Sequence, residues 1–162
     1  ANLSHADLQE ANLSNANLSH ADLQEANLSN ATLCGVYLWN GNLGNATFSG
    51  ANLSNAYMNS AKLKNANLSG ACLQDANLSD AKLKGANLSN TNLSGVNLSH
   101  ANLKNANLSD ANLENANLEG ANLEGANLSN ANLCGAKLSC IKTNQETQLE
   151  QGIILEKALA EL

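Results

Sequence analysis

Leucine recurs every five residues from Leu3 to Leu138, and only two other apolar residues, Phe48 and Met58, interrupt the series. A small residue, usually Ala, lies two positions before each of them, so residues 1–140 divide into 28 units of the form Ala-Asn-Leu-x-x. An α-helix needs a period of about 3.6 residues, a coiled coil about 3.5 and a half-buried strand about 2. A strict period of five fits none of these. The chain must therefore fold as a stack of repeating units.

Each unit predicts a very short strand followed by a corner. Side chains alternate along a strand, so the Ala and the Leu point inward while the residue between them points outward. The fifth position is Gly, Asn or Asp in 21 of the 28 units, and these residues tolerate the left-handed backbone of tight turns. Successive corners coil the chain, Leu fills the interior, and outward Asn side chains form ladders between coils.

Tandem Ala-Asn/Asp-Leu-x-x units resemble the pentapeptide repeat family, and the resemblance covers residues 1–140 without an insertion. It implies an all-β solenoid, a right-handed quadrilateral β-helix with four units per coil. On that basis residues 1–140 form about seven coils, and the rod is roughly 34 Å long at ~4.8 Å per coil. Residues twenty apart then stack in one column of the same wall.

Residues 141–162 leave the repeat and predict a second segment, a C-terminal α-helical cap. Thr143 and Glu146 have the spacing of a capping box. Apolar residues follow at roughly helical intervals, namely Leu149, Ile153, Leu155, Ala158, Leu159 and Leu162. Gly152 weakens a single helix, so one helix and two short helices both stay open. The tail is expected to cover the exposed edge of the last coil. The alternative is a homodimer through this end, which similar proteins also form.

Residue types and spacing argue against an enzyme, a cofactor or a metal site. The histidines His5, His20 and His100 each follow Ser in a turn, with no carboxylate at a fixed offset. A catalytic triad needs mutually hydrogen-bonded side chains beside a recess, and nearly flat walls offer no obvious recess. Cys and His lack zinc-ligand spacing, and no Gly-rich phosphate loop is present. We expect a protein without catalytic activity, cofactor or metal.

Stacking by twenty places five of the eight lysines on one wall. Lys62 and Lys82 share one column, and the next column of the same wall holds Lys64, Lys84 and Lys104. Like charges about 5 Å apart repel each other, so this clustering does not favour stability. We call these five lysines the lysine stripe. It is either a solvated copy of an Ala-Lys-Leu-Lys unit or a docking surface for an acidic partner.

An aromatic cluster is the second candidate partner-binding site. Tyr37 and Tyr57 are twenty residues apart and should stack, and Trp39 lies on the same wall. They are the only two Tyr and the only Trp of the chain. An exposed aromatic cluster suits a binding hot spot, but stacking between coils that merely stabilises the wall predicts the same pattern.

The expected function is a structural or protein-interaction module that binds another protein, whose identity the sequence leaves open, through one wall. The alternative, which the resemblance brings in, is a DNA mimic that acts on DNA gyrase or topoisomerase. The acids of the repeat cluster toward its two ends and lysines interrupt one wall between them, which disfavours mimicry. An ice-binding rod is also disfavoured, because only Thr32, Thr47 and Thr91 lie in the repeat. The net charge of −6 disfavours nucleic-acid binding.

The expected setting is a bacterium, cyanobacteria included, or a plastid. Many Asn-Leu-Ser sequons argue against a eukaryotic secretory route. No apolar stretch approaches the ~20 residues that cross a bilayer, so no membrane span is expected. The cytoplasm is favoured, and the periplasm or thylakoid lumen stays open if a segment before Ala1 was removed. A Cys134–Cys140 disulfide is also left open.

Overall fold

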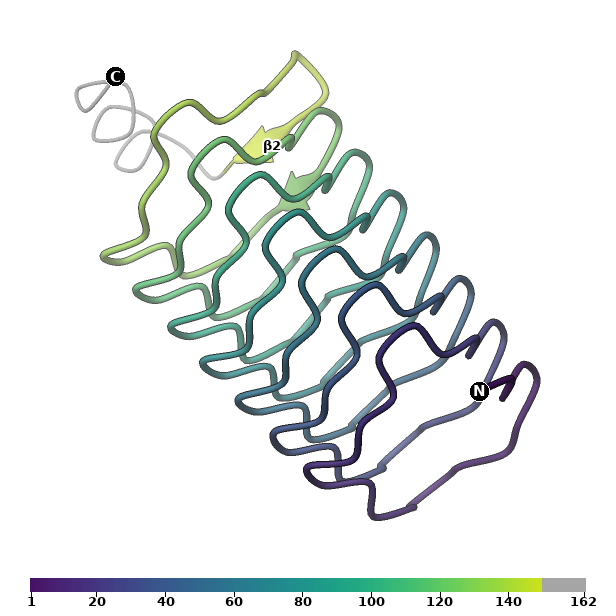
Figure 1. Cartoon of the computed structure of the whole chain (residues 1–162). Coiled ribbons are helices and arrows are strands. Elements are labelled where there is room, and N and C mark those ends of the chain that lie inside the picture. Colours follow the sequence, from purple (N-terminus) through teal and green to yellow (C-terminus); the bar gives the residue numbers. More distant parts are fainter. Residues whose placement is uncertain (150–162) are drawn as a thin grey trace.

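The computed structural model describes residues 1–149, which wind around one axis as a rod-shaped parallel β-helix (Figure 1). The outward residue of each unit pairs in parallel with the residue twenty positions later, from Asn2 with Asp22 to Asn122 with Lys142. A return after twenty residues means four five-residue units per coil, so residues 1–140 make seven coils. The four-sided β-helix that the family resemblance implied is thereby confirmed.

The strands of the rod are so short that most pairings are single-residue bridges. Within residues 1–149, two-residue strands form only where β1 (Asn127–Leu128) pairs in parallel with β2 (Gln148–Leu149). The part of the chain that the structure describes contains no helix long and apolar enough to cross a bilayer.

Backbone hydrogen bonds repeat from coil to coil. In the second coil, Leu23 N donates to Asn42 O at 2.7 Å and Glu25 N donates to Gly44 O at 3.0 Å, both in the following coil. Within the corner, Ala26 N donates to Leu23 O at 3.1 Å. Because each coil pairs with the next through this ladder, the ladder itself is left open only at the two ends of the repeat.

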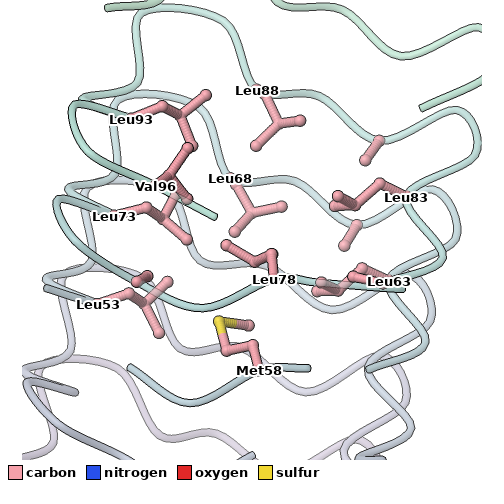
Figure 2. Close-up of a cluster of buried hydrophobic side chains, with 14 of the residues drawn as sticks. Leu53, Met58, Leu63, Leu68, Leu73, Leu78, Leu83, Leu88, Leu93 and Val96 are labelled. Carbon is pink, nitrogen blue, oxygen red and sulfur yellow. The ribbon is translucent and has the colours of Figure 1, made fainter. Parts of the chain in front are cut away.

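The core is a continuous column of Leu and Ala side chains. Every Leu-position residue from Leu23 to Leu128 is at most 2% exposed, Phe48 and Met58 included. Figure 2 shows one leucine from each wall of the fourth coil, Leu63, Leu68, Leu73 and Leu78, directed into the interior. Burial of each leucine contributes roughly 1.5–3 kcal/mol. The inward orientation of Leu therefore supplies the main driving force for stacking.

The corners carry a left-handed residue at every fifth position. All 28 fifth positions from His5 to Cys140 have a positive φ, between 54° and 70°, and eight of them are Gly. The corners predicted from Gly, Asn and Asp are therefore present. Corner residues such as Glu25 and His100 adopt the same conformation, and their backbone N–H groups donate to the following coil, Glu25 N to Gly44 O at 3.0 Å and His100 N to Glu119 O at 2.8 Å.

A corner side chain can occupy the space above the corner of the next coil, and this distinguishes two otherwise equivalent glycines. Gly70 and Gly95 both have a φ of +66°, but a Cβ on Gly95 would collide with the Asp75 carboxylate, whereas nothing lies within 4 Å of a Cβ on Gly70. We expect Gly70→Asn to melt within a few degrees of wild type. Gly95→Asn should lose about 0.5–1.5 kcal/mol of unfolding free energy, because the exposed Asp75 side chain must leave its present rotamer. Thermal melts followed by circular dichroism measure both, and equal losses would contradict the steric explanation.

The coil continues past the last sequence repeat. Lys142 still pairs with Asn122 at an offset of twenty, but β2 pairs with β1 at an offset of 21. A turn at residues 145–146 takes up the extra residue. Residues 141–149 therefore form part of an eighth coil, although their sequence no longer follows the repeat.

The helix predicted to begin at Thr143 is not formed within residues 143–149, and the rest of the predicted cap lies outside the described residues. The capping-box spacing misleads because the side chain of Asn144, not that of Thr143, binds backbone N–H groups. Asn144 Oδ1 accepts from Glu146 N at 3.1 Å and from Gly125 N of the last full coil at 2.9 Å. Pairing with the open edge of that coil therefore stabilises a strand and a turn in residues 143–149, although the local sequence favours a helix.

Candidate functional site

Two of the four walls carry the residues predicted to bind a partner. We call the wall built from the first unit of each coil the lysine wall; it comprises residues 1–5, 21–25, 41–45, 61–65, 81–85, 101–105 and 121–125. We call the preceding wall the aromatic wall; it comprises residues 16–20, 36–40, 56–60, 76–80, 96–100, 116–120 and 136–140. The aromatic wall leads directly into the lysine wall, so the two share one corner of the rod.

The lysine wall presents four exposed lysines in the fourth and fifth coils, Lys62, Lys64, Lys82 and Lys84. We call them the lysine quartet. Lys62 and Lys82 are direct bridge partners, so their side chains leave the wall one above the other. Within residues 1–149, no member of the quartet has a carboxylate within ion-pair distance, since the only ion pairs there involve His5 and Lys104.

Lys104, the fifth lysine of the predicted stripe, differs from the quartet. Its Nζ lies 2.9 Å from Oε2 of Glu124, which occupies the same column one coil further along. This contact neutralises Lys104 and leaves it half-buried. The sequence contains the signal for this pair, because Lys104 and Glu124 are twenty residues apart. Of the five lysines of the predicted stripe, only the quartet is therefore without an ion-pair partner within residues 1–149.

A shallow hollow of about 670 Å³ follows the lysine wall, and all four lysines of the quartet line it. It extends from Gln24 in the second coil to Asn102 in the sixth, and Asp80 and His100 border it from the shared corner. The wall was predicted to be nearly flat, so the hollow was missed. The signal that could have found it is Gly44, a glycine at a position that carries Gln or Lys in adjacent coils.

The aromatic side chains contact one another across coils. The rings of Tyr37 and Tyr57 stack with centroids 4.8 Å apart and planes within 4°, and the Trp39 ring meets the His20 ring edge-on at 4.3 Å. The two tyrosines and the tryptophan remain 38–45% exposed. Stacking of this kind stabilises the wall, and the exposed aromatic cluster stays a predicted partner-binding site. None of the three lines the hollow.

Groups that could support chemistry are dispersed over the described residues. Within residues 1–149, no three His, Cys, Asp or Glu side chains lie close enough to hold a metal ion. The four cysteines are free thiols, including Cys134 and Cys140. His5 Nδ1 contacts Glu25 Oε2 at 3.2 Å at an exposed corner. The arrangement offers charged and hydrogen-bonding groups for recognition.

Comparison with known proteins identifies the repeat. The family model for pentapeptide repeats matches in eight copies, over residues 1–40, 35–70, 71–110 and 101–139. No curated protein sequence matches the chain.

Three of the similar solved structures come from cyanobacteria and a plant. The pentapeptide repeat protein Rfr23 of Cyanothece 51142 shares 40% identity over 61% of this chain and 64% of its own, with a TM-score of 0.45. HetL of Nostoc sp. strain PCC 7120 is a protein involved in heterocyst differentiation regulation. It shares 34% sequence identity over 88% of this chain and 80% of its own, with a TM-score of 0.30. A pentapeptide repeat protein of the Arabidopsis thaliana thylakoid lumen shares 36% sequence identity over 50% of this chain and 60% of its own, with a TM-score of 0.44. The chain spans less than two thirds of the Cyanothece and Arabidopsis proteins.

Proposed function

The chain belongs to the pentapeptide repeat family, and we propose that it is a non-enzymatic interaction module that docks an acidic segment of another protein on the lysine quartet. Solenoids characteristically bind partners through extended walls. The quartet is the strongest concentration of one charge on the walls of this rod, and it lies on a protein of net charge −6. The same wall contains both the charge and the hollow that a partner requires.

The observation that carries this proposal is that, within residues 1–149, no carboxylate forms an ion pair with the quartet, although Asp80 borders the same hollow. Lys104 shows how a glutamate one coil along neutralises a lysine in its column. The quartet has no such glutamate, and its like charges repel across neighbouring coils about 4.8 Å apart. An acidic partner relieves this repulsion, and the positive patch also steers such a partner to the wall.

The surroundings of the quartet favour a short acidic segment over a long polyanion. Asp22 and Glu25 lie on the same wall toward the N-terminal end, and Glu124 lies toward the other end. A nucleic acid following the rod would meet these carboxylates on both sides of the lysines, and such contacts weaken binding. The lysine wall also opposes the DNA-mimic alternative, because a DNA mimic must present a continuous negative surface.

The proposal is tested with a fluorescein-labelled peptide of four consecutive glutamates flanked by two glycines at each end. We expect the combined variant Lys62→Gln, Lys64→Gln, Lys82→Gln and Lys84→Gln to bind it about tenfold more weakly than wild type. Four exposed ion pairs, each a few tenths of a kcal/mol or more, account for that loss. Fluorescence anisotropy at low ionic strength measures the affinity.

A charge-matched control separates a docking site from general charge attraction. The chain has eight lysines, so the variant Lys104→Gln, Lys137→Gln, Lys142→Gln and Lys157→Gln removes the same number of charges outside the quartet. It should keep nearly all of the binding. Equal weakening in both variants, or no binding by the wild type, would contradict the proposal.

A further inference from the structure

Gly44 is the one glycine of the described residues for which the fold shows no conformational or packing reason. Eight of the other glycines are corner residues with positive φ, which L side chains rarely adopt. Gly41 faces the interior, where a Cβ would lie 2.9 Å from Leu38 O. Gly44 lies outside both groups, since its φ is not in the left-handed range and a Cβ there would approach no atom closer than 3.8 Å.

The missing side chain of Gly44 leaves a recess beside the lysine quartet. Gln24 and Lys64 hold the same position in the coils on either side, and both carry long side chains. The atoms nearest to the vacant Cβ position are Gln24 Nε2 at 3.8 Å, Asn42 Oδ1 at 3.9 Å and Lys64 O at 3.9 Å. The recess and the quartet line the same hollow.

We propose that this recess receives an uncharged, hydrogen-bonding side chain of the bound acidic segment, such as Gln or Asn. This inference rests on the function proposed above for the same wall. The bound segment lies along the rod, with its acidic residues over the fourth and fifth coils and its uncharged residue over the third. Gly44 is then a specificity-determining residue, because any side chain at this position would fill the recess.

The groups around the recess determine the chemistry that it accepts. Gln24 Nε2 is a donor and Asn42 Oδ1 is an acceptor, whereas the Lys64 carbonyl already accepts from Asn45 N at 3.0 Å. A side-chain amide has both functions and matches this set. A carboxylate fits less well, because Asp22 accepts from Asn42 Nδ2 at 3.3 Å and so lies beside the recess. Like charges placed close together raise the cost of binding.

The direction of the segment follows from the shape of the hollow. The hollow runs from Gln24 to Asn102, along one wall over successive coils. A ligand that contacts both Gly44 and the quartet therefore crosses from the third coil to the fourth and fifth. Neighbouring coils lie about 4.8 Å apart, so a short extended peptide reaches both parts.

The experiment uses two labelled peptides and one substitution. The first peptide has four glutamates flanked by two glycines at each end, and the second replaces both terminal glycines by Gln, which allows either orientation. Wild type should bind the Gln-ended peptide about three- to tenfold more tightly, the range of one net hydrogen bond. Gly44→Gln places in the recess the side chain that Gln24 already carries one coil away. It should abolish this preference and leave the affinity for the Gly-ended peptide unchanged.

Ser49→Gln is the matched control, because Ser49 holds the same position of the same coil on the next wall. It should retain the preference for the Gln-ended peptide. The inference is overturned if wild type binds both peptides equally, or if Gly44→Gln weakens both peptides to the same extent. In those cases the quartet variant still decides the proposed function separately. Loss of binding in the quartet variant with no effect of Gly44→Gln would preserve the docking function and remove the recess from it.

Discussion

Leu78→Lys should unfold the rod in a cooperative transition well below the melting temperature of the wild type. Leu78 is 0% exposed and meets leucines of the other three walls in the fourth coil, near the middle of the seven. A lysine there would bury an ammonium group among methyl groups with no carboxylate to pair with, which costs several kcal/mol. Since each coil is stabilised by its neighbours, damage in the middle separates the rod into two shorter stacks.

The matched control is Asn77→Lys, which introduces the same side chain one residue away on the outward face. The equivalent second position already carries lysine at Lys62, Lys82 and Lys137. We expect Asn77→Lys to melt close to wild type. Urea and thermal unfolding followed by circular dichroism compare the three proteins. A Leu78→Lys protein that melts within about a degree of wild type would contradict the inward orientation of the leucines.

Removal of residues 141–162 should cause association or aggregation of the rod. The shortened chain loses the bond from Lys142 N to Ala121 O at 2.9 Å and the bond from Thr147 Oγ1 to Leu123 O at 2.9 Å. It also loses the partner strand β2, so β1 becomes an open edge. Unpaired edges beside exposed leucines are templates for pairing with another chain. Size-exclusion chromatography with light scattering measures the outcome.

A second truncation shows which part of the tail protects the edge. A chain that ends at Leu149 keeps the partial eighth coil and removes only residues 150–162. If residues 141–149 are sufficient to cover the last coil, this chain should stay at the mass of the wild type while the shorter one associates. Unchanged scattering after removal of residues 141–162 would show that the tail is not a cap. Association of both truncated chains would assign the protection to residues 150–162.

The rod could be predicted because its local and global patterns coincide. Each unit contacts only the units beside it in the coil and twenty residues away, so the period of Leu3, Leu8 and their successors describes the whole core. The corners were predicted for the same reason, since Gly, Asn and Asp supply the positive φ that each turn needs.

The tail could not be predicted because its structure depends on neighbours in space, whereas two parts of the candidate site were not predicted although the sequence contains their signals. Thr143 and Glu146 have helical spacing, but the free edge of the preceding coil offers backbone partners that a local pattern does not record. The lysine columns followed directly from the offset of twenty. Comparing residues twenty positions apart also finds the pairing of Lys104 with Glu124, if opposite charges are compared. The same comparison finds the recess at Gly44, if a glycine between longer side chains is looked for.

The constant offset of twenty residues has a consequence for insertions and deletions. Removal of one five-residue unit, such as residues 66–70, preserves the periodic core, because the next Ala-Asn-Leu unit takes the vacant place. Every residue after the deletion then moves to the adjacent wall, a quarter turn around the axis. Lys62 and Lys64 would part from Lys82 and Lys84, although no lysine has been removed. Folding therefore tolerates length changes in steps of five residues, whereas a surface shared between coils survives only changes of twenty.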